Sequence, residues 1–461
     1  AGAISIACLS GTVDYTQAGG PVYQDPTTGA LVGAGGGYLT PVILPGAQAA
    51  LQDTKLTASD GVLRRGGLPF RAIGVNAHNL FEDLLKSGTR YIADLASIAA
   101  SGVRVIRISA VPGSTADWGT YVGTVGGSPV STYIPALRTF LDECAKNGIS
   151  CIVSLLWNHF RVSAVVSSTE ADFATANSKS RKYCVDFSQV IVRNFYDHPA
   201  VAAWGIGNEW SNYAFASKFL TSAATSAVSI TAAANNGSGL IRLTASGHAV
   251  PSGFTFPVKV RSVGGTIEAN GDWRATYVSA TQVDLVGSTF STAYTSGGTI
   301  EIDHKLSCIE SINEVVSAIR KYDPQRAIVA PTGMQSWFLA GDFKTYIKEV
   351  MDYTGNCDTF ALHYYPDIWS DESNAHSFVG EDQKAGPVFL SALRAEALAR
   401  RKAVIVEECN AQFDNPAGSL AQTTYNQCIA AGFELILDWG WYADPADVGL
   451  PNLKTTRNAV M

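Results

Sequence analysis

The chain has 461 residues, enough for one large domain with additions or for two to three domains of ordinary size. Charged residues make up 16% of it and the net charge is −7, against roughly 25% charged residues in an average soluble protein. There is no basic block, so neither nucleic acid nor an anionic membrane surface is an expected partner. No apolar run approaches the roughly 18 residues that span a bilayer, so no membrane segment is expected.

The first part of the chain is rich in glycine and almost lacks basic residues. Residues 1–60 predict an extended or β-rich N-terminal extension with little core of its own. The first ten residues contain neither Met nor a basic segment, so an intact signal peptide is not expected there. The eight cysteines are scattered and form no CxxC pair, which argues against a zinc site. We therefore expect neither a metal nor a cofactor, and the cysteines leave the redox compartment open.

From residue 56 onward the pattern changes to a hairpin (56–70) followed by alternating strands and helices. The predicted strands are residues 71–76, 103–109, 149–156, 201–208, 326–331, 359–365, 403–408 and 433–439. Eight strand–helix units are the number of a (β/α)8 or TIM barrel, an α/β fold. A doubly wound open sheet is the alternative, but no Gly-rich phosphate turn follows the first strand.

One interval breaks this alternation. Residues 227–302 are rich in Val, Ile, Thr and Gly, have no helical period, and are punctuated by Gly-Gly and Asn-Gly turn signals. We expect them to form a small all-β domain inserted after strand four, since exposed loops tolerate insertions. The predicted organisation is an extension (1–60), the first part of the barrel (61–226), the insert (227–302) and the second part of the barrel (303–461).

Two predicted strands end in carboxylic acids. WGIGNEW ends strand four in Asn208 and Glu209, and AVIVEECN ends strand seven in Glu407 and Glu408. The carboxyl ends of barrel strands meet at one face, where barrel enzymes keep their sites. Two acids that face each other across one site are the catalytic pair of a glycoside hydrolase. Further polar and aromatic candidates at strand ends, or in the loop after strand one, are His78, Arg107, Trp157, Asn158, His159, His363, Tyr365 and Trp439.

Seven of the nine tryptophans follow closely on strand ends, which predicts a rim of indoles. Sugar rings stack their C–H faces on indoles, so the rim favours a saccharide cleft. The alternative is that some of these side chains only pack loops onto the barrel, because Trp is highly buried on average. The seven are Trp118, Trp157, Trp210, Trp337, Trp369, Trp439 and Trp441.

These motifs together resemble glycoside hydrolase family 5, within the clan of retaining (β/α)8 glycosidases, over roughly residues 60–222 and 303–445. The opening hairpin and first strand look like those of the family. GVRVIRIS, WGIGNEW, HYYP and KAVIVEECN look like its second, fourth, sixth and seventh strands. Ala403 replaces the usual Pro, Cys409-Asn410 replaces an aromatic-Gly ending, and LLWNHF lacks the usual Asp-x-His, so His159 is a candidate only.

The resemblance implies a role for each matching residue. Glu209 would be the acid/base and Glu408 the nucleophile, with their carboxyl groups about 5–5.5 Å apart. Because neighbours on a strand point to opposite faces, we expect Glu407 to point away from the site. The implied substrate-binding residues are Arg107 beneath the nucleophile, Asn208 at the 2-hydroxyl, Trp439 under the −1 sugar, and His363, Tyr365, Trp157, His159, Trp210 and Trp337.

The insert resembles a small β-barrel module of phage tail and virion proteins, and the inserted half-domain of ubiquitin-activating enzymes. The chain as a whole is expected to be a retaining endo-β-glycosidase, secreted or virion-associated, whose partner is a polysaccharide or oligosaccharide. A non-catalytic carbohydrate-binding or phage structural protein and a retaining transglycosylase are the alternatives. The sugar and the oligomeric state stay open.

Overall fold

A computed structural model describes residues 22–24, 31–33, 54–157, 159–168, 172, 177–210, 227–332, 343–364, 385–409 and 419–439. Most of the expected N-terminal extension lies outside these ranges. Within it, two short strands pair in antiparallel fashion, β1 (Val22–Gln24) and β2 (Leu31–Gly33).

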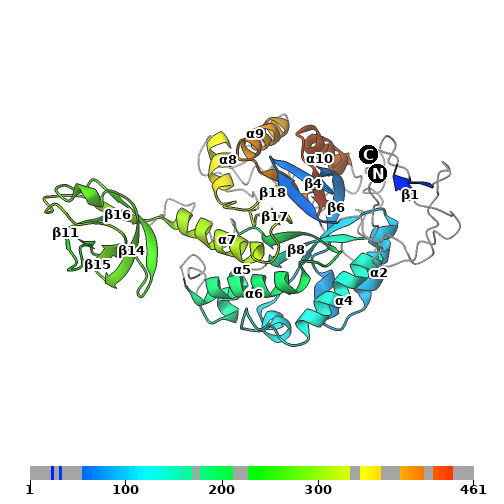
Figure 1. Ribbon diagram of the computed structural model, residues 1–461, viewed down its shortest axis with the longest axis horizontal. Helices are drawn as coiled ribbons and strands as arrows, with labels where there is room; N and C mark the ends of the chain where they lie inside the picture. The colour runs from blue at the N-terminus through cyan, green and yellow to red at the C-terminus, as the bar shows by residue number, and fades with distance from the viewer. Residues whose placement is uncertain are drawn as a thin grey trace.

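Eight parallel strands close into a barrel in the order β17-β18-β19-β20-β6-β7-β8-β9 (Figure 1). Their bounds are β6 (Ala72–Asn76), β7 (Val105–Ser109), β8 (Ser150–Leu156), β9 (Val201–Gly207), β17 (Ile328–Val329), β18 (Thr359–Tyr364), β19 (Ala403–Cys409) and β20 (Leu435–Asp438). The sheet is closed, so the (β/α)8 prediction is confirmed and the open doubly wound sheet is excluded.

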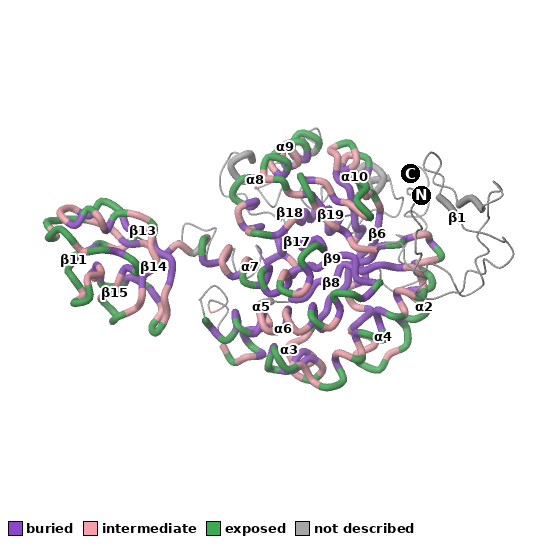
Figure 2. The backbone as a smooth tube through the Cα atoms, viewed as in Figure 1, coloured by how far each residue is buried: buried purple, intermediate pink, exposed green. Residues whose placement is uncertain are grey.

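The barrel strands are buried on both faces, as the purple strands at the centre of Figure 2 show. Every residue of β8, β9 and β19 is buried. A strand between the barrel interior and an outer layer of helices needs apolar residues on both faces, which explains the continuous apolar runs in the sequence.

Helices form the outer layer of the barrel (Figure 1). In α4 the side chains that reach the core recur at helical spacing, as in Tyr133, Leu137 and Phe140. The helices are α1 (Leu80–Leu85), α2 (Arg90–Ala100), α3 (Thr115–Asp117), α4 (Tyr133–Lys146), α5 (His159–Val165), α6 (Lys179–Phe195), α7 (His304–Arg320), α8 (Phe343–Asp352), α9 (Ala385–Ala399) and α10 (Ser419–Ala430), with a π-helical turn at Trp118–Val122. Among the described residues, no helix is long and apolar enough to cross a membrane.

The expected hairpin covers the amino end of the barrel. It consists of β3 (Leu56–Ser59), β4 (Val62–Arg65) and the short β5 (Leu68–Pro69). Its turn, Asp60-Gly61, has φ angles of 53° and 77°, a left-handed pair typical of tight hairpins. Leu56 and Leu63 are fully buried and join the residues that fill the barrel interior. The site described below lies at the other end of the barrel.

The insert stands apart from the barrel, beyond the first turn of α7 (Figure 1). Its seven antiparallel strands have the order β10-β16-β13-β14-β15-β12-β11 and enclose a separate apolar core. They are β10 (Val228–Ser229), β11 (Ala232–Asn235), β12 (Ile241–Thr244), β13 (Thr255–Arg261), β14 (Gly271–Ser279), β15 (Gln282–Leu285) and β16 (Thr299–Ile302), with a 3-10 turn at Ile267–Ala269. A TIM barrel with an all-β insert is therefore confirmed; the exact domain boundaries and the likeness to virion modules stay predictions.

Candidate active site

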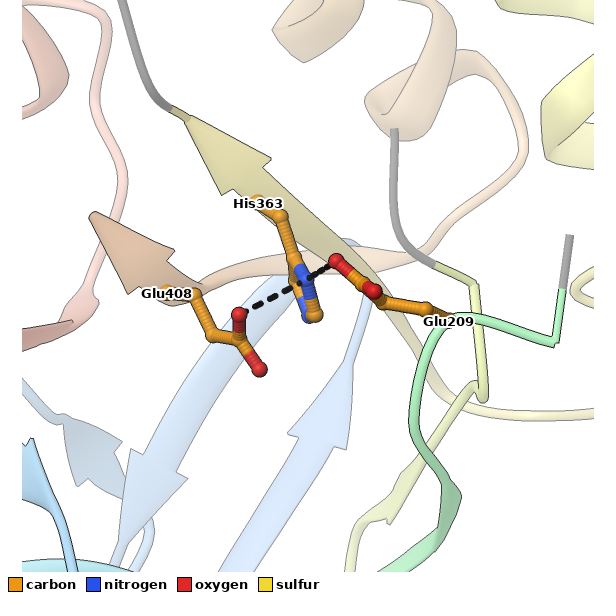
Figure 3. A group of neighbouring side chains, drawn as sticks. All are labelled: Glu209, His363 and Glu408. Atoms are coloured by element: carbon orange, nitrogen blue, oxygen red, sulfur yellow. Dashed lines mark hydrogen bonds and ion pairs between the residues drawn. The ribbon is translucent and has the colours of Figure 1, made fainter. Parts of the chain in front are cut away.

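His363 lies between two glutamates at the carboxyl end of the barrel (Figure 3). Its Nδ1 atom is 2.8 Å from Oε1 of Glu209 and 3.1 Å from Oε2 of Glu408. The imidazole is fully buried, and the two glutamates are 6% and 3% exposed. The three side chains come from β18, the residues after β9, and β19, so strands far apart in the sequence supply one cluster.

Arg107 of β7 is fully buried and contacts this cluster from the barrel interior. Its Nη1 donates to Oε1 of Glu408 across 2.9 Å, and its Nη2 donates to Oδ1 of Asn208 across 2.8 Å. Further hydrogen bonds run from Arg107 to Oδ1 of Asn76, Oγ of Ser154 and the carbonyl oxygen of Gly207. A guanidinium so bonded cannot rotate, and it fixes the Glu408 carboxylate while neutralising part of its charge.

The backbone at Glu209 turns sharply after β9. Its φ is 48°, in the left-handed region that residues other than glycine seldom adopt. Trp210 follows, and its ring packs so closely against Gly207 that a Cβ there would lie 2.1 Å from the indole Nε1. The strained residue is held by its surroundings, as is common at functional sites, and its carboxyl group reaches His363.

Contrary to the expectation from strand alternation, the side chain of Glu407 does not point away from the site. Its Oε1 lies 2.9 Å from Arg107 Nε and its Oε2 lies 3.4 Å from His363 Nε2. The pairing between β18 and β19 slips here: Leu362 is opposite Val406, but His363 is opposite Glu408. This β-bulge inserts Glu407 as an extra residue and breaks the alternation, so both glutamates contact the same two partners.

The charges around His363 change its acidity. Burial by itself would lower the pKa of the imidazole, but the charge of Glu408 and hydrogen bonds to Glu209, Glu407 and Glu408 outweigh it. The pKa of His363 is therefore raised well above its ordinary value of about 6.5. This shift favours the imidazolium form of the ring at neutral pH.

An aromatic stack lies beside the acids. The ring of His78 stacks on Trp157 and Trp439, with centroids 5.5 Å and 5.2 Å away. Arg107 lies over the Trp157 ring at 3.9 Å. Burial lowers the pKa of His78, with Arg107 adding to this effect and Glu408 opposing it. Trp439 is partly exposed, so of the two indoles it has the more surface left for a ligand.

The structure brings most of the predicted site residues together: Arg107, Trp157, Asn208, Glu209, His363, Glu408 and Trp439. Trp210 differs, because it is 1% exposed and its Nε1 donates to the carbonyl oxygen of Leu156, which makes it a packing residue here. His159 is the first residue of α5, and its side chain is not described. Asn158, Trp337 and Tyr365 lie outside the described residues.

The sequence did not indicate two polar residues that belong to the cluster. Asn76 donates from Nδ2 to the carbonyl oxygens of Glu407, across 2.7 Å, and Asp438, across 3.2 Å. Oγ of Ser154 accepts a hydrogen bond from Nε of Arg107. The signal available for Asn76 was its place as the last residue of the first predicted strand, the same position that drew attention to Asn208.

Glu209, His363 and Glu408 each offer a donor atom within 4.8 Å of the others. Such a group has the dimensions of a metal site. However, the carboxylates around His363 raise its pKa, and a protonated imidazole has no lone pair to give to a metal. The arrangement fits proton sharing between acids.

Several solved structures have this fold. An endo-1,4-β-mannanase from Rhizomucor miehei matches with a TM-score of 0.50 at 13% identity, over 88% of this chain and 99% of its own. A glycoside hydrolase family 5 mannosidase from Rhizomucor miehei matches with a TM-score of 0.51 at 13% identity, over 88% and 98%. This chain spans 57% of the exo-β-1,4-mannosidase Op5Man5 from Opitutaceae bacterium strain TAV5, which covers 86% of this chain at 13% identity and a TM-score of 0.48.

No protein-family model and no curated protein sequence matches the chain. The structural matches at such low identity establish the fold, which is the (β/α)8 barrel of family 5 glycoside hydrolases. The sequence-based expectation of a family 5-like barrel is confirmed.

Proposed function

We propose that this protein is a retaining endo-β-glycosidase that hydrolyses a β-linked polysaccharide by double displacement. Glu209 is the acid/base and Glu408 the nucleophile. The observation that carries the proposal is the contact of both acids with one atom, His363 Nδ1, at 2.8 Å and 3.1 Å. The donor atoms of Glu209, His363 and Glu408 lie within 4.8 Å of one another, which suits the carboxyl separation of retaining enzymes, about 5–5.5 Å, better than the roughly 6.5–9.5 Å of inverting ones.

In the first step Glu408 attacks the anomeric carbon as Glu209 protonates the leaving oxygen. A bond forms between the Glu408 oxygen and the sugar, the glycosidic C–O bond breaks, and the proton of Glu209 leaves with the aglycone. Arg107 stabilises the ionised nucleophile through its 2.9 Å hydrogen bond. The side-chain oxygen of Asn208 accepts a hydrogen bond from Arg107 Nη2. This orients the side chain so that its amide nitrogen can donate to the substrate.

In the second step Glu209, now ionised, takes a proton from water. The water oxygen attacks the anomeric carbon, the ester to Glu408 breaks, and the product keeps the β configuration. Trp439 would support the sugar ring beside the acids. With a polymeric substrate, we expect the protein to act outside the cell or on a virion.

The test is release of reducing ends from defined polysaccharides: β-1,4-mannan first, then β-1,4-glucan, xylan, mixed-linkage glucan and microbial exopolysaccharides. We expect one of them to be shortened internally by the wild type, and the size of early products to show endo cleavage. Glu408→Gln is expected to abolish hydrolysis and to keep saccharide binding, measured by calorimetry. Binding without any hydrolysis by the wild type would contradict the proposal and favour a carbohydrate-binding protein.

A matched control is available on the same barrel. Glu434 is another buried glutamate with an arginine partner, Arg394, but it precedes β20 at the amino end of the barrel. Glu434→Gln is expected to retain hydrolysis. A similar loss in both variants would mean that disturbance of the barrel, and not loss of the nucleophile, explains the Glu408 result.

A further inference from the structure

Glu407 is a fully buried acid to which the double displacement gives no role. It is the extra residue of the β-bulge, and the slip in register also appears on the other side of β19, between Val406 and Cys409 in the pairing with β20. Asn76 donates to the bulged peptide at the Glu407 carbonyl oxygen across 2.7 Å. The bulge is therefore held in place by a side chain of β6, which lies beyond β20 in the barrel.

The two nitrogens of His363 have different partners. Nε2 faces Glu407 Oε2 at 3.4 Å, whereas Nδ1 faces Glu209 and Glu408 at 2.8 Å and 3.1 Å. A bare Nε2 would place its lone pair against the Glu407 carboxylate, and a bare Nδ1 would place its own against the ionised Glu408. Both nitrogens therefore carry hydrogen, and Glu407 fixes the ring from the side away from the catalytic acids.

The double displacement proposed above requires Glu408 to be ionised and Glu209 to carry the proton that it donates. In that state Arg107 and the imidazolium of His363 face the carboxylates of Glu407 and Glu408. Other titratable side chains of the same strand ends are His78, close enough to Glu408 to feel its charge, and Asp438, beside Cys409. Glu407 supplies the negative charge that faces Nε2, and a fully buried imidazolium loses this compensation when Glu407 is neutralised.

During the reaction the negative charge moves from Glu408, which becomes an ester, to Glu209, which gives up its proton. The Nδ1–H of His363 lies within hydrogen-bond distance of both. The hydrogen bond that Nδ1–H donates can switch from one acid to the other without movement of the ring, because Glu407 fixes the position of Nε2. Such a preorganised donor stabilises charge wherever it develops.

We propose that Glu407 is a positioning residue that keeps His363 as an imidazolium, with one N–H shared by the two catalytic acids, and that it thereby sets the alkaline limit of hydrolysis. This inference rests on the proposed function for its effect on hydrolysis. The protonation state of His363 is a separate claim that needs no substrate.

The first test is nitrogen-15 NMR of the imidazole groups in the full-length protein, with His363 assigned by its loss in His363→Gln. In the wild type both ring nitrogens of His363 are expected to stay protonated through pH 8. In Glu407→Gln, which keeps the shape and removes the charge, the midpoint is expected to fall by at least about one pH unit. Wild-type His363 that titrates near pH 6.5 would overturn the proposal, even if the Gln variant failed to fold.

The second test is the pH profile of kcat/KM. Glu407→Gln is expected to move the alkaline limb to lower pH by about the same amount as the His363 midpoint, to lower kcat and to leave KM nearly unchanged. Glu407→Asp, which keeps the charge, should lie closer to the wild type, and Glu434→Gln should not move the limb. An unmoved limb in Glu407→Gln overturns the role in hydrolysis. If the wild type cleaves no glycan, the proposed function fails, and the NMR result still decides the state of His363.

Discussion

Arg107 and Glu408 form a buried ion pair, although the two residues are neighbours neither in the sequence nor in the sheet. Nη1 of the arginine lies 2.9 Å from Oε1 of the glutamate, and the side chains are 0% and 4% exposed. β7 and β19 are separated in the barrel by β20 and β6, so the arginine reaches across the interior to the acid. Removal of either partner leaves a buried charge, and several expectations follow from that.

Arg107→Met is expected to lower both stability and activity. It removes the cation that faces Glu407 and Glu408, and loss of one partner from a buried ion pair costs about 3–5 kcal/mol in the free energy of unfolding. Denaturant unfolding measures this cost. Arg104→Met, at the residue before β7 and with a side chain that bonds to backbone oxygens, is the control. Equal stability of the two variants would contradict the claim that Arg107 compensates the buried charges of Glu407 and Glu408.

Glu209→Gln is expected to lower kcat/KM by about 10²–10⁴-fold for substrates with poor leaving groups, because proton donation is lost. The loss should be much smaller for an aryl glycoside whose leaving group needs no proton. In Glu209→Ala, azide should restore turnover and yield a glycosyl azide of β configuration. A loss of equal size for every leaving group would argue that Glu209 is structural.

The pH dependence of stability should reveal the raised pKa of His363. A histidine whose folded-state pKa lies above the unfolded value stabilises the fold fully below about pH 6.5. That contribution disappears as the pH rises through the folded-state pKa. The difference in the free energy of unfolding between wild type and His363→Gln should therefore shrink from pH 6 towards pH 10.

His198 provides the opposite sign. Burial lowers its pKa, with Asp142 opposing the shift. Its contribution should be present above about pH 6.5 and should be lost as the pH falls through the folded-state pKa. If the free energy of unfolding changed with pH in the same direction in His198→Gln and His363→Gln, relative to the wild type, these histidines would not determine the pH dependence of stability.

The insert should unfold without the barrel. Leu243 lies in the apolar core of the insert and Leu435 lies in the barrel interior, both fully buried. Leu243→Ala is expected to cost about 2–5 kcal/mol locally and to raise hydrogen exchange in β10–β16 alone. Leu435→Ala should raise exchange throughout the barrel strands. Faster exchange at β18 and β19 in Leu243→Ala would show that the two cores are coupled.

The sequence predicted the barrel because each strand is a continuous apolar run, and it predicted Glu209 and Glu408 because each follows such a run. Strand ends were less predictable. Residues 326–331 were expected to form a strand, but only Ile328–Val329 does. The backbone N–H of Arg326 instead donates to Oδ1 of Asp323, and Pro331 has no N–H for a ladder.

Glu407 was missed because alternation along a strand holds only while the register is unbroken. The bulge depends on how β18, β19 and β20 pair, and on the hydrogen bond from Asn76 to the bulged peptide. Those are contacts between segments far apart in the chain, and a local pattern does not contain them. The stack of His78 on Trp157 and Trp439 is of the same kind.

Covalent trapping tests the pair of catalytic acids most directly. The wild type would be incubated with the 2-deoxy-2-fluoroglycosyl fluoride of the sugar that it hydrolyses, and the labelled peptide would be sequenced by mass spectrometry. The account predicts a fluoroglycosyl ester on Glu408. An ester on Glu407 or Glu209, or no ester together with a product of inverted configuration, would contradict it.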